Sequence, residues 1–248
     1  MTRHPTCKSI PITEISSPNG YGAVDFEAAL CRFIVQFQNP KLTRRQIEEA
    51  SYDVHLPFYS LPVFHKIKFW NEEVHGNVTL NSIHAYPARS KNGSITRASR
   101  FDTALVFLQK PGVNSAVNNQ DLEQPAVTGM RVGQVRVIFS LPESQSRILF
   151  PSGQFPPHHL AYIEWFSRFP SHTDPHLKLY KLSRVITNGE RLASIVPVSL
   201  IQRSVHLFPK WGRNAAGIAL WSSETVLEQC DVFYFNSFKD RHTYYNVY

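Results

Sequence analysis

The residues that could bind a metal ion or act as nucleophiles are eleven histidines, three cysteines and scattered carboxylates. His172 and His176 have the i,i+4 spacing of a two-ligand helical face, but Pro175 lies between them and is incompatible with a helix there. His158 and His159 are adjacent, so their side chains diverge in an extended segment. Because no CxxC or HExxH motif supplies further ligands, we expect no bound metal and no cofactor.

Catalytic groups are equally hard to recognise. The chain has no GxSxG elbow, no P-loop and no GxGxxG fingerprint, so no nucleophile or phosphate cradle is indicated. Asp102, Glu164 and Asp231 are the carboxylates that could hold a catalytic metal ion, but each is isolated among apolar residues. Exposure on a strand, or a hydrogen bond to a neighbouring arginine, explains each of them more simply. We therefore expect no catalytic residue.

Positive charge is concentrated in one part of the chain. The net charge is +7, and residues 131–213 contain eleven Lys and Arg but only four Asp and Glu, so this stretch holds the whole excess. Aromatic residues lie among these cations, as in YIEWFSRF, KLYKLSR and HLFPKWGR, and such mixtures can contact phosphates and stack on bases. The pattern predicts a polyanionic partner; a solvated surface that aids solubility is the simpler alternative. The candidate nucleic-acid-binding residues are Arg136, Lys178, Lys181, Arg184, Arg203, Lys210 and Arg213.

The elements that would position these residues are mainly strands. In residues 25–37 apolar residues recur at helical spacing, with Asp25 placed to cap the helix and Pro40 to end it. A capping-box pattern at Thr43 and Gln46 predicts a short second helix. Beyond these helices side chains alternate with the period of two that is typical of strands, and turn-rich segments separate the predicted strands. Near the end of the chain, SSETVLEQ predicts a short C-terminal helix. We expect a mainly β fold, α+β at the margin: an antiparallel small barrel or sandwich with an amphipathic N-terminal helix over one edge.

The predicted organisation has four parts. Residues 1–22 are polar and rich in Pro, Ser, Thr and Gly, and we expect a disordered lead-in. Residues 23–108 would hold the helix and the first β segments, and the turn-rich residues 109–129 a polar loop. Residues 130–248 would form a barrel-like C-terminal region, although 23–248 could also pack as one domain.

Cellular context follows from two further features. No apolar run approaches the roughly 18 residues that are needed to cross a membrane. The cysteines Cys7, Cys31 and Cys230 are odd in number and far apart, which argues against a disulfide framework. We expect an intracellular chain without a membrane association.

The order of the segments resembles the C-terminal region of Plavaka-type transposases, which are encoded by DNA transposons abundant in fungal genomes. The resemblance covers roughly residues 24 to 248, in segments such as VDFEAALCRFIVQFQNP, LPVFHKIKFWN, HLAYIEWFSRF, RLASIVPVSLIQRSVHLFPKWG and VLEQCDVFYFNSFKDRHTYYNV. It implies that the metal-dependent catalytic core of such a transposase lies upstream, and that this chain is a separated tail with no catalytic position carried over. A weaker similarity of pattern links the β-rich end to bromo-adjacent-homology (BAH) barrels, modules that bind chromatin proteins or nucleosomes.

Four hypotheses follow for the function. The first is a non-catalytic transposase module that binds DNA or chromatin through the basic stretch, in the nucleus. The second is a protein–protein interaction module that docks to a transposase core or reads chromatin as a BAH-like domain. The third is a residual hydrolase activity, which would nick DNA with Mg²⁺ or Mn²⁺ and depend on Asp102 or Glu164. The fourth is a transposon remnant without a selected function. None of the four involves a small-molecule substrate.

Overall fold

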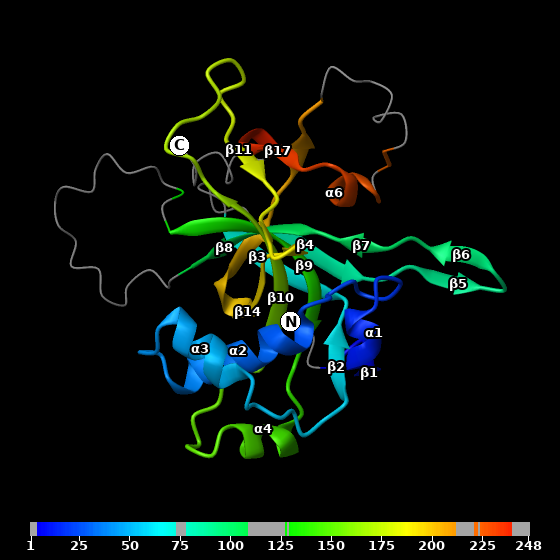
Figure 1. Cartoon of the computed structure of the whole chain (residues 1–248). Coiled ribbons are helices and arrows are strands. Elements are labelled where there is room, and N and C mark those ends of the chain that lie inside the picture. Colours follow the sequence, from blue (N-terminus) through cyan, green and yellow to red (C-terminus); the bar gives the residue numbers. More distant parts are fainter. Residues whose placement is uncertain are drawn as a thin grey trace.

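The computed structural model of the chain describes residues 4–72, 78–108, 127, 129–211, 221–222 and 224–239. Strands make up 40% and helices 21%, and the sheets are antiparallel, which confirms the predicted mainly β class. Figure 1 shows the central strands with the N-terminal helices on one side and a small C-terminal sheet on the other. None of the helices in the described ranges is long and apolar enough to span a membrane.

Seven strands form the central sheet: β1 (Cys7–Pro11), β2 (Ser60–Phe64), β8 (Thr103–Phe107), β9 (Met130–Phe139), β10 (Leu160–Arg168), β14 (Ala193–Pro197) and β15 (Ile201–Ser204). The sheet is built around β9, which pairs on one side with β10, and β10 pairs in turn with β14. On its other side the first half of β9 pairs with β8, and its end pairs with β2. β1 extends the sheet beyond β2, and β15 extends it beyond β8. Strands from 23–108 and from 130–248 therefore share one sheet.

Three strands near the C-terminus form a smaller sheet: β11 (Lys181–Ser183), β16 (Leu207–Pro209) and β17 (Val232–Phe235), with β17 in the middle. β16 follows β15 closely in the chain, and the β11 edge reaches β10 through the single bridge between Phe166 and Arg184. Both sheets contribute to one apolar cluster, in which the rings of Phe166 and Phe233 meet edge to face at 5.5 Å. Because a single bridge is not a ladder, the described strands curl toward a barrel without closing one.

The helices are α1 (Ile12–Ser16), α2 (Phe26–Gln38), α3 (Arg44–Ser51), α4 (Glu143–Leu149) and α6 (Val226–Gln229), with short 3-10 turns at η2 (Val198–Leu200) and η3 (Ser237–Lys239). α2 and α6 are the predicted N-terminal and C-terminal helices, and α3 begins with the predicted capping box. The buried face of α2 packs on the central sheet, where the ring of Phe26 lies 5.1 Å from that of Phe139. Asp25 precedes α2 without a capping hydrogen bond and forms an ion pair with Arg32 instead.

The predicted disordered lead-in is wrong for its described part, residues 4–22. β1 pairs with β2, α1 buries Ile15 completely, and Tyr21 is only 1% exposed. The polar composition of this stretch concealed a few apolar residues that all enter the core. The predicted polar loop, 109–129, lies outside the described residues except for positions 127 and 129.

A hairpin projects from the body of the fold. Its base is the antiparallel ribbon of β3 (Lys66–Glu72) and β4 (Val78–Tyr86), with β7 (Arg100–Phe101) paired to the end of β4. Between β4 and β7 the chain runs outward as β5 (Arg89–Lys91) and returns as β6 (Ser94–Arg97). Figure 1 shows β5 and β6 extending away from all other elements. We call residues 88–97 the arm.

Candidate functional site

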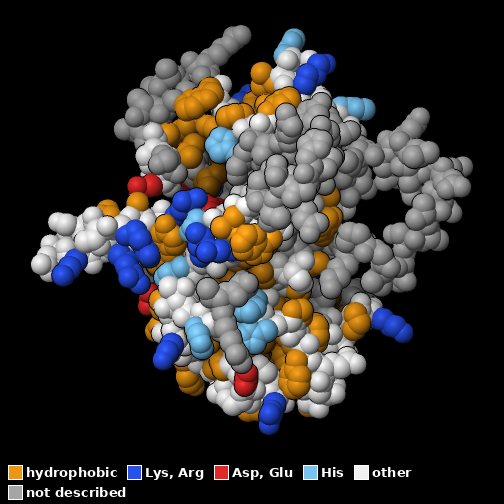
Figure 2. Space-filling model, turned by 180° about the vertical axis from the view of Figure 1, so that it is seen from behind, with side chains coloured by type: hydrophobic (Ala, Val, Ile, Leu, Met, Phe, Trp, Pro, Cys, Tyr) orange, Lys and Arg blue, Asp and Glu red, His pale blue; other side chains and the backbone are white. Residues whose placement is uncertain are grey.

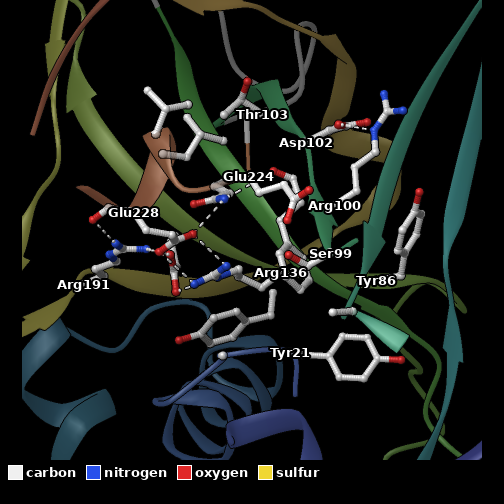
Figure 3. Close-up of a pocket in the computed structure, with 18 of the residues that line it drawn as sticks. Tyr21, Tyr86, Ser99, Arg100, Asp102, Thr103, Arg136, Arg191, Glu224 and Glu228 are labelled. Carbon is white, nitrogen blue, oxygen red and sulfur yellow. Dashed lines mark hydrogen bonds and ion pairs between the residues drawn. The ribbon is translucent and has the colours of Figure 1, made fainter. Parts of the chain in front are cut away.

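A cleft among the described residues has a volume of about 1400 Å³. It lies between the loop before α2, the base of the arm, the central sheet and α6. Figure 3 shows Tyr21 and Tyr86 on one side of it and the charged side chains of Arg136, Arg191 and Glu228 on the other.

Two glutamates in the cleft are held by arginines from several strands. Glu164 on β10 accepts hydrogen bonds from Arg136 Nε at 3.1 Å and from Arg191 Nη1 at 3.0 Å. Glu228 on α6 accepts from Arg136 Nη1 at 3.0 Å and is also paired with Arg191, which lies on the short strand β13 (Glu190–Arg191). Arg184 Nη1 lies 3.9 Å from Glu164 Oε2. We call these five residues the ion-pair network; it joins α6 to β9, β10 and β13.

The network shifts the pKa values of Glu228 and Arg184. Burial opposes the charge of Glu228, but the guanidinium groups of Arg136 and Arg191 outweigh it and lower the pKa of that carboxyl. Burial, with the adjacent Arg191 charge, lowers the pKa of Arg184 to about 9, which leaves it a cation at neutral pH. Because the charges compensate one another inside the fold, the network acts as a structural link between elements.

The carboxylates considered for catalysis have structural partners as well. Asp102 accepts from Arg100 Nε at 2.9 Å and from the backbone N–H of His84 at 2.8 Å. The prediction of an arginine partner is therefore confirmed for Asp102 and for Glu164, while Asp231 lies exposed beside β17. In the described ranges no group of three or more His, Cys, Asp and Glu is arranged to hold a metal ion.

The seven predicted nucleic-acid-binding residues do not form one surface. Arg136 and Arg184 belong to the ion-pair network, and Arg203 is only 2% exposed on β15. A buried cation that is already paired cannot contact phosphate, so the prediction is wrong for these three. The exposed ones are Lys178, Lys181 and Lys210, and Arg213 lies outside the described residues.

The arm carries the exposed positive charge that the sequence analysis missed. From Tyr86 to Phe101 the chain contains Arg89, Lys91, Arg97 and Arg100 but no Asp or Glu. Every residue from 88 to 96 is exposed. The net charge of the whole region outside 131–213 is zero, so this local run of cations does not show in the total. The Asn–Gly pair at the turn, between two short cationic segments, was the signal that could have found it.

The geometry of the arm leaves its cations facing one another. Arg89 lies directly opposite Arg97 across the ribbon, and like charges in such a pair repel. The Arg97 guanidinium carbon sits 4.0 Å from the ring centroid of Tyr86, while Arg97 Nε and Nη2 have no hydrogen-bond partner in the described chain. Figure 2 shows Lys and Arg side chains on the projecting arm and around its base. At the base, Lys66 and Lys68 are exposed on β3.

The base of the arm is fixed by buried rings. His65 Nε2 lies 2.9 Å from the hydroxyl of Tyr21, and its ring centroid is 5.8 Å from that of Tyr86. Burial, assisted by the charges of Arg97 and Arg89, lowers the pKa of His65 to about 4, so this imidazole is neutral at physiological pH.

Comparison with known proteins gives a family without a stated activity. A family model described as a domain of unknown function (DUF6830) matches residues 1–182. No curated protein and no solved structure matches the chain. The matched range contains the arm and the strands β9 and β10, whereas α6 lies beyond it.

Proposed function

Because the chain belongs to the DUF6830 family, whose description names no activity, we propose its function from the geometry of its exposed charge. It is a non-catalytic module of a transposase-related protein that binds nucleic acid through the arm and the adjoining lysines of β3. The observation that carries this proposal is a projecting hairpin, exposed from residue 88 to residue 96, that contains several cations and no carboxylate. Phosphate contacts require cations that are not already neutralised by neighbouring acids.

The transposase-related part of the proposal rests on the ordered segments that resemble Plavaka-type transposases. DNA, bare or in chromatin, is the partner that such a protein would have, and the nucleus is the compartment in which it would act. A transposase core is a further partner in keeping with this origin. The charge of the arm supports nucleic-acid binding independently of the resemblance.

The cleft is a poorer candidate for the same ligand. Its lining includes four cations, Arg97, Arg100, Arg136 and Arg191, but six acids, Asp25, Asp102, Glu164, Glu190, Glu224 and Glu228. A phosphate group that entered it would meet an excess of negative charge. The arm, which exposes Arg89 and Lys91 with no acid beside them in the sequence, is the more favourable place for a phosphate.

The test compares two triple substitutions in the full chain. Arg89→Gln, Lys91→Gln and Arg97→Gln neutralise the arm. Lys178→Gln, Lys181→Gln and Lys210→Gln neutralise three exposed cations of the stretch 131–213. Fluorescence anisotropy with labelled DNA of mixed sequence at about 50 mM salt measures binding where phosphate contacts are strongest. We expect the arm variant to lose most of the affinity and the control variant to keep most of it.

Two results would contradict the proposal. One is an unaltered chain that binds neither duplex nor single-stranded DNA at this salt concentration. The other is a control variant that loses binding while the arm variant keeps it, because the interface would then lie on the C-terminal sheet. Circular dichroism of all three proteins verifies that each is folded.

A further inference from the structure

The arm is a two-stranded antiparallel ribbon that is regular next to its turn and has a register shift between Arg89 and Ser90. Asn92 and Gly93 have φ angles of 52° and 77°, the positive values of a two-residue type I′ turn, whose twist matches that of the flanking strands. Lys91 pairs with Ser94 next to the turn, and Arg89 pairs with Arg97 at the base. Such a turn defines the direction of the ribbon, and the arm is therefore built as a rod and not as a loose loop.

The size of the ribbon suits one groove of duplex DNA. Paired strands lie about 5 Å apart, so two strands with their side chains are roughly 10 Å wide. The major groove is about 12 Å wide and 8.5 Å deep, whereas the minor groove is about 6 Å wide. Residues 88 to 92 reach about 16 Å at roughly 3.3 Å per residue, enough to span the depth of the major groove.

The side chains of the arm suit paired bases better than unpaired ones. Residues 87–100 contain no aromatic residue, so the arm offers no platform on which single-stranded bases could stack. Near the turn the ribbon carries Ser90 and Ser94, whose hydroxyls can donate to or accept from base edges. The Thr96 hydroxyl donates to the Arg89 carbonyl at 3.1 Å and can still accept. Ile95 is 71% exposed and can contact a thymine methyl group, which faces the major groove.

The cations are placed for the phosphates on either side of a groove. Arg89 and Arg97 lie at the base of the arm, on opposite strands of the ribbon. Arg89 is exposed, whereas Arg97 is half-buried beside Tyr86, with its Nε and Nη2 atoms enclosed and without a hydrogen-bond partner in the described chain. The mutual repulsion of the two arginines is relieved when anions lie beside them. Lys66 and Lys68, exposed on β3, extend the positive charge beyond the base of the arm.

We infer that the arm enters the major groove of duplex DNA, with the hydroxyls and Ile95 near its tip at the base edges and the arginines of its base on the flanking phosphates. This inference rests on the proposed function and states how the same site meets its ligand. It assigns the contact to double-stranded DNA and to one groove.

The experiment is a dimethyl sulfate footprint of the full chain on a labelled duplex, together with affinities for that duplex and for each of its strands. Dimethyl sulfate methylates guanine N7 in the major groove and adenine N3 in the minor groove. We expect protection at N7 and single strands that bind about tenfold more weakly or worse, since the base-edge contacts are lost with the duplex. The arm triple variant should lose the N7 protection, and the Lys178, Lys181 and Lys210 variant should retain it.

The outcomes separate the inference from the function on which it rests. Protection at adenine N3 alone, or equal arm-dependent affinity for duplex and single strand, would overturn groove entry and leave nucleic-acid binding by the arm intact. Loss of arm dependence on both kinds of DNA would overturn both.

Discussion

Replacing Glu164 by glutamine should destabilise the fold and leave DNA binding by the folded protein unchanged. The Glu164 side chain is 5% exposed and accepts from Arg136 at 3.1 Å and Arg191 at 3.0 Å, with Arg184 at 3.9 Å. Removing its charge leaves Glu228 as the only carboxylate in the ion-pair network beside three guanidinium groups, a loss of about 3–5 kcal/mol in the free energy of unfolding. In a chain of this size that is a fall in midpoint of roughly 6–20 °C.

Thermal and urea unfolding followed by circular dichroism measure this effect. Glu190→Gln is the matched control, because Glu190 is exposed on the same short strand as Arg191 and should change the stability by no more than about 0.5 kcal/mol. DNA affinity is measured below the midpoint of each variant. If Glu164→Gln kept the original midpoint and lost DNA binding, the network would be the interface, and its assignment as a structural link would be wrong.

Three further predictions concern single residues. His65 should lower the free energy of unfolding by about 3 kcal/mol as the pH drops from 6.5 to 4. The reason is that its imidazole takes up a proton in the unfolded chain but not in the folded one, where its pKa is about 4. Urea unfolding across this pH range should show a weaker pH dependence of the unfolding free energy for His65→Gln. Arg203→Glu should strongly lower the midpoint of thermal unfolding measured by calorimetry, because it places a negative charge where a buried arginine lies. Lys210→Glu, at an exposed position, should shift the midpoint little. Equal shifts would contradict the burial of Arg203. Gly93→Val should weaken DNA binding, because the φ of 77° at this position is unfavourable for valine and would disturb the turn. The thermal midpoint of the whole fold should not change, because no other group lies near the added Cβ. An unaffected DNA affinity would show that the turn does not orient the arm.

Local features of the fold could be predicted from the sequence because they depend on neighbours in the chain. The apolar spacing of 26–37 specified α2, and Thr43 with Gln46 specified the start of α3. Each of these depends on contacts or periods of a few residues.

The ion-pair network could not be predicted in the same way. Arg136 and Glu228 are 92 positions apart, and Arg136 and Glu164 are 28 apart, so no local pattern pairs them. A charge sum along the chain counts a buried, compensated arginine and an exposed one alike. Residues 131–213 do carry an excess of positive charge, but three of the candidate residues among them, Arg136, Arg184 and Arg203, point into the fold.

The arm could have been found from the sequence by examining shorter windows. Its cations lie within a dozen residues that contain no acid, around an Asn–Gly pair that favours a tight hairpin. What the sequence could not give is the exposure of residues 88 to 96, which follows from the absence of any packed element beside the arm in the described part of the fold.

The slope of log affinity against log salt concentration tests the central claim most directly. Duplex binding is measured between about 50 and 200 mM salt for the unaltered chain, for the arm triple variant and for the control triple variant of Lys178, Lys181 and Lys210. Loss of three phosphate contacts should reduce the slope of the arm variant by about 2.7, equivalent to roughly 40-fold in affinity over this range. The slope of the control variant should stay near that of the unaltered chain. An arm variant with the unaltered slope, or a larger reduction in the control, would contradict nucleic-acid binding by the arm.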